Sequence, residues 1–237
     1  MRSASSGFYA LFSGAKKRLA FSHPAGRLFH NILPVKSEDR CYTVFDRLQL
    51  LEPLGIPHAG PQTEFSFKPE NAARAGAFLS GAGIRPGTLI VTLDITSPRK
   101  HRRWAPENFA MLADRLLTGF GARVIFLWGP EELDYVKTAM SAAKEKHLLC
   151  PDFNLSDLAA LMKLAGLHVG ASSAPMHIAV SQGIPTFTVY APQNSPASWS
   201  PPGHLHSWAQ GELSSLSSEA VWARLSAHVK TVKGEPA

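Results

Sequence analysis

The chain has 237 residues, of which 45% are hydrophobic and 18% charged, a composition that fits a globular protein with a buried core and argues against wholesale disorder. Its net charge of +6 allows an anionic partner, but no stripe of cations and no recognition-helix motif accompanies it, which disfavours nucleic acid. The two cysteines, Cys41 and Cys150, show neither metal-ligand spacing nor a disulfide pattern, so we expect a reducing, cytoplasmic location.

The first part of the chain shows few regular patterns. Gly7–Ala15 is a short apolar stretch similar to a weak signal peptide, but Lys16 and two further basic residues follow at once, and no clean cleavage site is present. The stretch is also too short to span a bilayer. Arg18–Phe21 is a candidate strand and Val44–Leu54 a candidate helix. This is too little to form a second full domain.

From Pro69 onward, helical and extended patterns alternate. The turn signal Arg85–Gly87 precedes an apolar, β-branched run that predicts a strand over 89–95. Pro106 then begins a helix with apolar residues at spacings of three and four. The same reasoning predicts strands over 123–128, 147–149, 167–170 and 186–190, helices over 69–79, 106–117, 156–165, 175–182 and 219–229, a helix after the 129–132 turn, and a loop over 194–203.

Strands separated by helices predict an α/β fold with a parallel, doubly wound, Rossmann-like sheet. In such sheets the ligand binds beyond the carboxyl ends of the strands. The turns that follow the strands are therefore the places to look for function.

The turn Val169–His177 leads from a strand of small residues into a helix that begins near Pro175. Small side chains let the backbone approach a ligand, and the free amides and dipole of a helix start favour an anion. The hydroxyls of Ser172 and Ser173 would add donors, and His177 lies within reach. The alternative is an ordinary helix start with a structural histidine.

The turn after the strand at 89–95 carries Thr96, Ser97 and the basic run Arg99–Arg103. Hydroxyls beside guanidinium groups suit a diphosphate, because arginine makes paired hydrogen bonds to phosphate oxygens. The alternative is a solvated basic loop. Trp104 beside Pro106 is more typical of a packing anchor than of a platform for a stacked base.

A third turn, Trp128–Glu132, places acids after a strand. A carboxylate there can accept two ribose hydroxyls, although an acid in the first turn of a helix also complements the helix dipole. The sequence has no G-x-G-x-x-G after a strand, no P-loop, no G-x-S-x-G and no H-E-x-x-H. NAD dehydrogenases, P-loop enzymes, α/β-hydrolases and a metal site are therefore not expected.

Taken together, the three turns resemble the signature of glycosyltransferase family 9, the ADP-heptose:lipopolysaccharide heptosyltransferases. The family pattern is G-x-D-[ST]-G-x-x-H-[LI]-A, followed by G-x-P-T and a W-x-P-x-G loop. The matching segments are Leu164–Thr186, Ala191–Pro192, Trp199–Gly203, Arg102–Pro106 for a K-x-W-P element, Trp128–Glu132 for a glycine-rich turn with an acid, and Ser13–Leu19 for a segment late in the family's N-terminal domain.

The resemblance implies the GT-B arrangement, in which two Rossmann-like domains enclose the active site and the C-terminal one binds the nucleotide sugar. It implies transfer with inversion, without metal or cofactor, from ADP-heptose or a similar donor to a lipopolysaccharide core acceptor at the inner face of a bacterial inner membrane. Ser173, Ala174 and His177 would line the diphosphate, Arg102 would replace a family lysine on the phosphates, and Glu132 would hold the ribose. The complete implied donor site is Thr96, Ser97, Arg102, Glu132, Ser172, Ser173, Ala174 and His177.

Two residues of the signature depart from the family pattern. Ser172 replaces an aspartate, and Ala174 replaces a glycine and resists positive φ. Loss of one good contact there would cost about 1–3 kcal/mol of donor or transition-state binding. The family's general-base aspartate and acceptor site have no counterpart in this sequence, and Asp94, which ends a strand of the other domain, is not expected to be the base.

We therefore expect residues 1–75 to be a remnant of the acceptor-side domain with a linker, and residues 76–237 to be the nucleotide-sugar domain. Two interpretations stay open. The chain is a glycosyltransferase that is incomplete alone and needs a partner chain for the missing half, or it is a non-catalytic nucleotide-binding half-module. In either case we expect exposed apolar surface and self-association.

Overall fold

The computed structural model describes residues 4–37 and 42–234, which divide into two compact units, Met1–Gln62 and Thr63–Ala237. The boundary therefore lies before the expected one at residue 75. The reason is helix α3 (Pro69–Gly81), which packs on helix α6 (Leu155–Lys163) of the second unit. There Asn71 Nδ2 and Arg74 Nε donate to Oδ1 of the buried Asp157, at 2.7 and 2.9 Å. Cys41 lies outside the described residues.

The second unit is built on a six-stranded parallel sheet with the order β3-β2-β1-β4-β5-β6. The predicted doubly wound α/β fold is confirmed, and the strand order reverses between β1 and β4. The strands are β1 (Ile90–Asp94), β2 (Arg123–Leu127), β3 (Leu148–Leu149), β4 (Leu167–Ala171), β5 (Thr186–Tyr190) and β6 (His206–Gln210).

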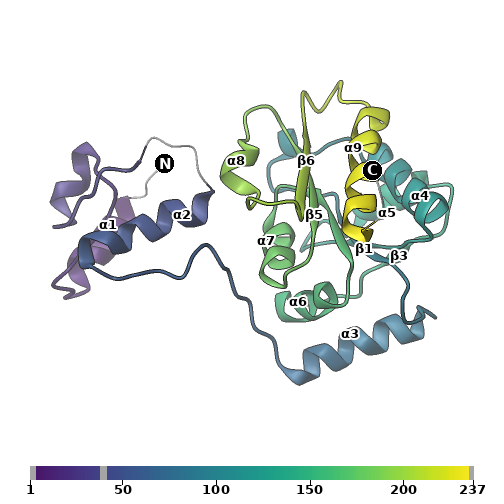
Figure 1. Ribbon diagram of the computed structural model, residues 1–237, viewed down its shortest axis with the longest axis horizontal. Helices are drawn as coiled ribbons and strands as arrows, with labels where there is room; N and C mark the ends of the chain where they lie inside the picture. The colour runs from purple at the N-terminus through teal and green to yellow at the C-terminus, as the bar shows by residue number, and fades with distance from the viewer. Residues whose placement is uncertain (1–3, 38–41, 235–237) are drawn as a thin grey trace. The chain divides into compact units, whose positions relative to one another are not determined.

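Helices cover both faces of this sheet (Figure 1). On one face, α4 (Pro106–Phe120), α5 (Leu133–Ala142) and α9 (Ser218–Lys233) share a core with the strands through side chains such as Phe109, Val136 and Leu225. On the other face, α3, α6 and α7 (Ala174–Ser181) share a second core. The sheet is thus the middle of three layers.

The ends of these helices follow from local chemistry. Helix α4 continues through Gly119 and stops at Gly121, which adopts φ 66° and serves as the C-cap, so the predicted end at Leu117 is one turn early. Helix α6 begins at Leu155, because the side chain of Asn154 accepts from two first-turn amides in a capping box. Helix α9 is capped by Ser217, whose hydroxyl accepts from the amide of Ala220 at 3.2 Å.

The first unit contains α1 (Ala4–Phe12), α2 (Thr43–Leu48) and two 3-10 helices, η1 (Pro24–Leu28) and η2 (Gln49–Leu54). The expected strand over 18–21 is wrong, since the chain makes only an isolated bridge between Leu19 and Ile32 there. The expected helix over 44–54 is divided into α2 and η2, and Pro53, which has no amide hydrogen, lies in the 3-10 part.

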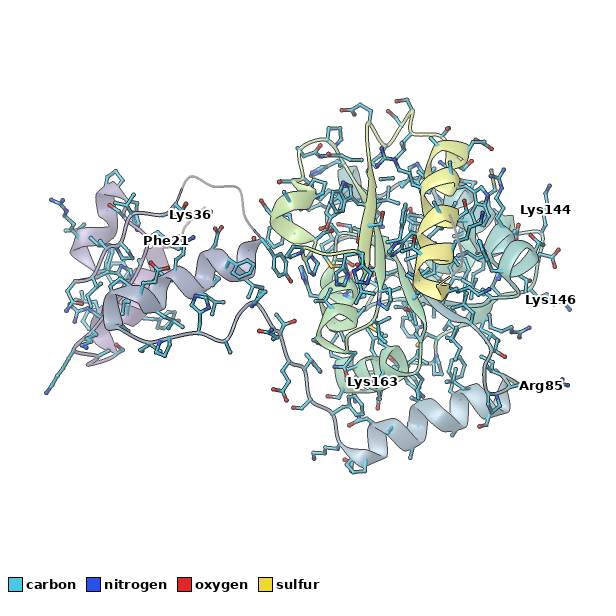
Figure 2. The ribbon with its side chains drawn as sticks, in the orientation of Figure 1. Phe21, Lys36, Arg85, Lys144, Lys146 and Lys163 are labelled. Atoms are coloured by element: carbon cyan, nitrogen blue, oxygen red, sulfur yellow. The ribbon has the colours of Figure 1, made fainter. Side chains whose placement is uncertain are left out.

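Few large side chains are buried in the first unit. Phe21 and Tyr42 are buried (Phe21 is labelled in Figure 2), whereas Phe8, Tyr9 and Phe12 of α1 are 51%, 79% and 80% exposed. Helix α1 covers much of the stretch considered above as a signal peptide. None of the described helices is long and apolar enough to cross a membrane.

Candidate functional site

The turns after β1 and β4 begin side by side at the carboxyl edge of the sheet. Asp94 and Gly170 are partners in the register of these two strands. A Cβ on Gly170 would collide with the carbonyl oxygen of Asp94, so only glycine permits this close approach. Because the strand order reverses between β1 and β4, this is the place where a doubly wound sheet binds its ligand.

Asp94 joins the two turns. Its Oδ1 accepts from the amide and hydroxyl of Thr96 at 3.0 and 2.8 Å, and its Oδ2 accepts from the hydroxyl of Ser173. Burial raises the pKa of the Asp94 carboxyl, although the hydrogen bonds from Ser173 and Thr96 oppose this effect. The structure therefore brings together two predicted site residues through an aspartate to which we assigned no role.

Arg103 joins the first turn to the third. Its Nε donates to the carbonyl oxygen of Ser97 at 2.7 Å, and its Nη2 lies 3.1 Å from Oε1 of Glu132. The guanidinium group also lies over the ring of Tyr135, 4.8 Å from its centroid. Glu132, the predicted ribose ligand, is therefore already paired with a cation through one of its oxygens. Sequence reasoning missed this role of Arg103.

The neighbouring Arg102 has the opposite environment. Its Nε is buried and has no hydrogen-bond partner among the described residues. Burial and the charge of Arg99 both lower the pKa of the Arg102 guanidinium, as expected for a cation that lacks a counter-ion. The residue lies at the end of a short 3-10 turn, Lys100–Arg102. An anionic ligand would supply the counter-ion that the Arg102 guanidinium lacks.

The turn after β4 leaves the start of helix α7 open. Ser173 is the N-cap residue, but its side chain makes no hydrogen bond to the amides of the first turn. The half-buried Ser172 precedes it. Ala174 is the first helical residue, and Glu131 is the one non-glycine residue with positive φ in the described part of the chain. The expectation that Ala174 would have to resist a positive φ is therefore wrong, because this position is helical.

His177 lies on the first turns of α7 and faces a loop. Its ring lies 6.0 Å from that of Trp199, which ends the short helix α8 (Pro196–Trp199) within the predicted loop. Burial lowers the pKa of His177, so the ring is neutral near pH 7. A neutral imidazole can donate one hydrogen bond but supplies no charge.

Trp104 is a packing anchor, as expected. It is 1% exposed, packs edge-to-face on Phe109 and donates from Nε1 to the carbonyl oxygen of Leu216 at 2.9 Å. It fixes the end of the turn that carries Arg102 and Arg103.

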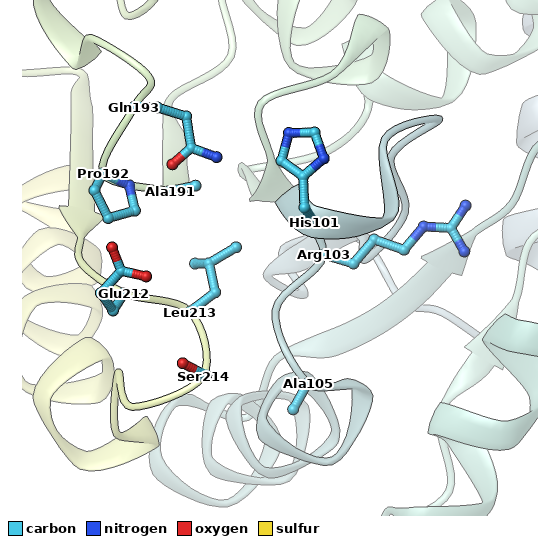
Figure 3. Close-up of a pocket in the computed structure, with 9 residues that line it drawn as sticks. All are labelled: His101, Arg103, Ala105, Ala191, Pro192, Gln193, Glu212, Leu213 and Ser214. Atoms are coloured by element: carbon cyan, nitrogen blue, oxygen red, sulfur yellow. The ribbon is translucent and has the colours of Figure 1, made fainter.

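A cavity of about 470 Å³ opens beside these turns (Figure 3). It lies between the loops that follow β1, β5 and β6, and the guanidinium group of Arg103 is directed away from its other lining residues. None of the eight predicted site residues lines it. Its lining consists of His101, Arg103, Ala105, Ala191, Pro192, Gln193, Glu212, Leu213 and Ser214. In residues 4–37 and 42–234, no cluster of three or more histidine, cysteine or acidic side chains suited to a metal occurs.

Known proteins resemble this chain in sequence and fold. It is 26% identical over 166 residues to lipopolysaccharide heptosyltransferase 3 of Escherichia coli, a match that covers 68% of this chain and 47% of that protein. It is 29% identical over 183 residues to the lipopolysaccharide core heptosyltransferase OpsX of Haemophilus influenzae, covering 73% of this chain and 50% of that protein. The chain thus spans about half the length of the curated relatives it matches.

The fold matches a solved structure of a family 9 glycosyl transferase from Veillonella parvula, with a TM-score of 0.85 and 22% identity, over 98% of this chain and 72% of that one. This supports the GT-B fold class expected from the sequence. The sequence profile of glycosyltransferase family 9 (heptosyltransferase) matches residues 5–215. This chain therefore belongs to glycosyltransferase family 9.

Proposed function

We propose that this chain binds the nucleotide sugar for a glycosyltransferase that adds a sugar, heptose by family resemblance, to a lipopolysaccharide core acceptor. The observation that carries the proposal is Arg102, a cation at the carboxyl edge of the sheet whose buried Nε has no partner within residues 4–37 and 42–234. It occupies the position where the family resemblance expects a phosphate-binding lysine. A diphosphate would satisfy both its charge and its free donor.

The rest of the proposed donor site follows from the turn after β4. The first-turn amides of α7 have no side-chain cap, and the helix dipole favours an anion at this end. His177 would add a neutral donor from the same helix. The second oxygen of the Glu132 carboxylate would accept from a ribose hydroxyl while the first stays on Arg103. We expect no metal or cofactor in this reaction, by family resemblance.

The acceptor side is part of the same proposal. The family resemblance places the general base and the acceptor site in an N-terminal domain whose motif has no match in this sequence. We propose that both lie on such an N-terminal domain, on the same polypeptide or on a partner chain, and that transfer takes place at the cytoplasmic face of the inner membrane. The exposed aromatic side chains of α1 are compatible with such a partner.

Calorimetric titration with ADP tests the donor site. We expect saturable binding that weakens roughly 10- to 100-fold in Arg102→Ala, because a hydrogen bond to a charged group contributes about 1.5–3 kcal/mol. Arg85→Ala is the matched control, since it removes the same charge from an exposed residue that precedes β1, at the opposite edge of the sheet (Figure 2). Equal binding by all three proteins would refute the proposed role of Arg102.

The second candidate is a nucleotide-binding module without catalysis. Two substitutions favour it, since Ser172 and Ala174 stand where the family pattern has aspartate and glycine. Release of ADP from ADP-heptose, measured with a core acceptor and an added N-terminal domain of a family 9 relative, separates the two candidates. Turnover supports the transferase, whereas binding without turnover supports the module.

A further inference from the structure

Two hydroxyl groups at the proposed donor site donate to the buried carboxyl group of Asp94. Asp94 is 2% exposed and cannot itself contact a ligand. Thr96, which is 6% exposed, and the half-buried Ser173 both donate to it. Each hydroxyl has one hydrogen, so a hydroxyl that donates to Asp94 has only lone pairs left for a ligand.

These lone pairs do not suit a phosphate. A phosphate oxygen would have to take the hydrogen of Thr96 or Ser173 away from the buried carboxyl group of Asp94, which leaves that group with one donor fewer. Glu132, the charged group that acts on Asp94 from the turn after β2, is paired with Arg103, so the Arg103 guanidinium group is already engaged.

A sugar hydroxyl suits the same lone pairs, because it has a hydrogen to donate. We propose that Asp94 is a positioning residue, itself held by Thr96, that makes Ser173 an acceptor for a hydroxyl group of the donor's sugar, and that the phosphates bind to Arg102 and the start of α7. This inference rests on the proposed function. It changes the role of Ser173, which the family resemblance places on the diphosphate.

This role of Asp94 fits one departure from the family pattern, at Ser172. Ser172 stands where the family has an aspartate, so this turn has lost a carboxylate from its exposed side. Asp94 supplies a carboxyl group from beneath the turn and acts on the ligand through the hydroxyl of Ser173. The turn thereby keeps a hydrogen-bond acceptor for the ligand without carrying a charged side chain at its surface.

The test compares binding of ADP-heptose with binding of ADP to the full chain, by calorimetry. Ser173→Ala removes one acceptor, and Asp94→Asn lets an amide hydrogen face Ser173 and reverse its hydroxyl. We expect each variant to lower the ratio of ADP-heptose affinity to ADP affinity at least threefold, with little change in ADP affinity itself. Asp152→Asn, an exposed residue after β3, is the control and should leave the ratio unchanged.

The outcomes separate this inference from the proposed function. An unchanged ratio in Ser173→Ala, or a loss of ADP affinity as large as that of ADP-heptose affinity, overturns the role of the Ser173 hydroxyl and leaves the donor site standing. If Asp94→Asn does not fold, Ser173→Ala decides, because it deletes a single oxygen. Failure of the folded wild-type chain to bind either ligand overturns both proposals.

Discussion

The turns after β1 and β4 start from neighbouring strands but are held in different ways. The turn after β1 is fixed by side chains that it carries itself, since its Arg103 bonds Ser97 within the turn and Glu132 beyond it, and its Trp104 is buried against Phe109. The turn after β4 is held from outside, through the bond between Ser173 and Asp94, and its helix start has no side-chain cap. The first turn is therefore a scaffold that presents Arg102, and the second is an open surface for a ligand.

The largest expected effect is a loss of stability at acid pH, and it arises in the strands beneath both turns. His168 of β4 bonds Thr92 of β1 at 3.0 Å, and its Nε2 is buried and has no partner in the described part of the chain. Burial lowers the pKa of His168 to about 3, so the unfolded chain takes up a proton before the folded one does. Stability is fully present above pH 6.5 and is lost, by about 1.4 kcal/mol per pH unit, as the pH falls toward 3.

Urea unfolding at pH 6.5 and pH 5 measures this loss. The double variant Thr92→Val with His168→Leu removes both polar partners and should lose about 2 kcal/mol less than the wild type between these two values. The comparison is needed because His206 also has a pKa lowered by burial, to about 4, and contributes its own acid sensitivity. Equal losses in both proteins would show that His168 is not neutral in the folded state as described.

The next largest effect is the loss of stability when Arg103, which holds the turn after β1 in place, is removed. Arg103 and Glu132 are each 18% exposed, so water screens their ion pair only partly. Arg103→Ala should lower the free energy of unfolding by about 1–2 kcal/mol, because it also leaves Glu132 and the Ser97 carbonyl without their donor. Arg99→Ala, an exposed neighbour, should change stability by less than about 0.5 kcal/mol. Similar changes in stability in Arg103→Ala and Arg99→Ala would show that Arg103 does not fix the turn after β1, and the difference between the two turns would disappear.

The smallest effect concerns the turn after β4. Ala174 is exposed and already helical, so Ala174→Gly should change ADP affinity by less than about threefold, which corresponds to roughly 0.6 kcal/mol. Titration of both proteins with ADP provides the comparison. A gain of tenfold or more would mean that the methyl group of Ala174 obstructs the phosphates and that this turn is less open than we describe.

Much of the fold could be predicted because its signals are local. The strands β1, β2, β4 and β5 are apolar runs between turn residues, and α4 and α6 have apolar residues at helical spacing. Strand β6 was missed because it lies at the sheet edge, where Ala209 is its one buried residue, and a polar edge strand has no apolar run. The first unit was predicted poorly, since it buries few side chains and so has little periodicity.

In the candidate site, too, the features set by local sequence could be predicted and those set by distant contacts could not. The positions of Ser173 and Arg102 on turns at one sheet edge follow from local patterns and from the order of strands. The bond between Asp94 and Ser173, 79 residues apart, depends on the register of β1 with β4, which no local pattern fixes. The different environments of Arg102 and Arg103 arise from a single 3-10 turn, so adjacent and identical residues could not be distinguished in advance.

The most direct test of the donor site is the change in backbone and arginine Nε resonances of the ¹⁵N-labelled chain on titration with ADP. We predict the largest changes at residues 172–177 and 96–102, with a new, protected Nε–H signal from Arg102. Changes concentrated instead at residues 191–193 and 212–214, which line the neighbouring cavity, would contradict the account and place the nucleotide there.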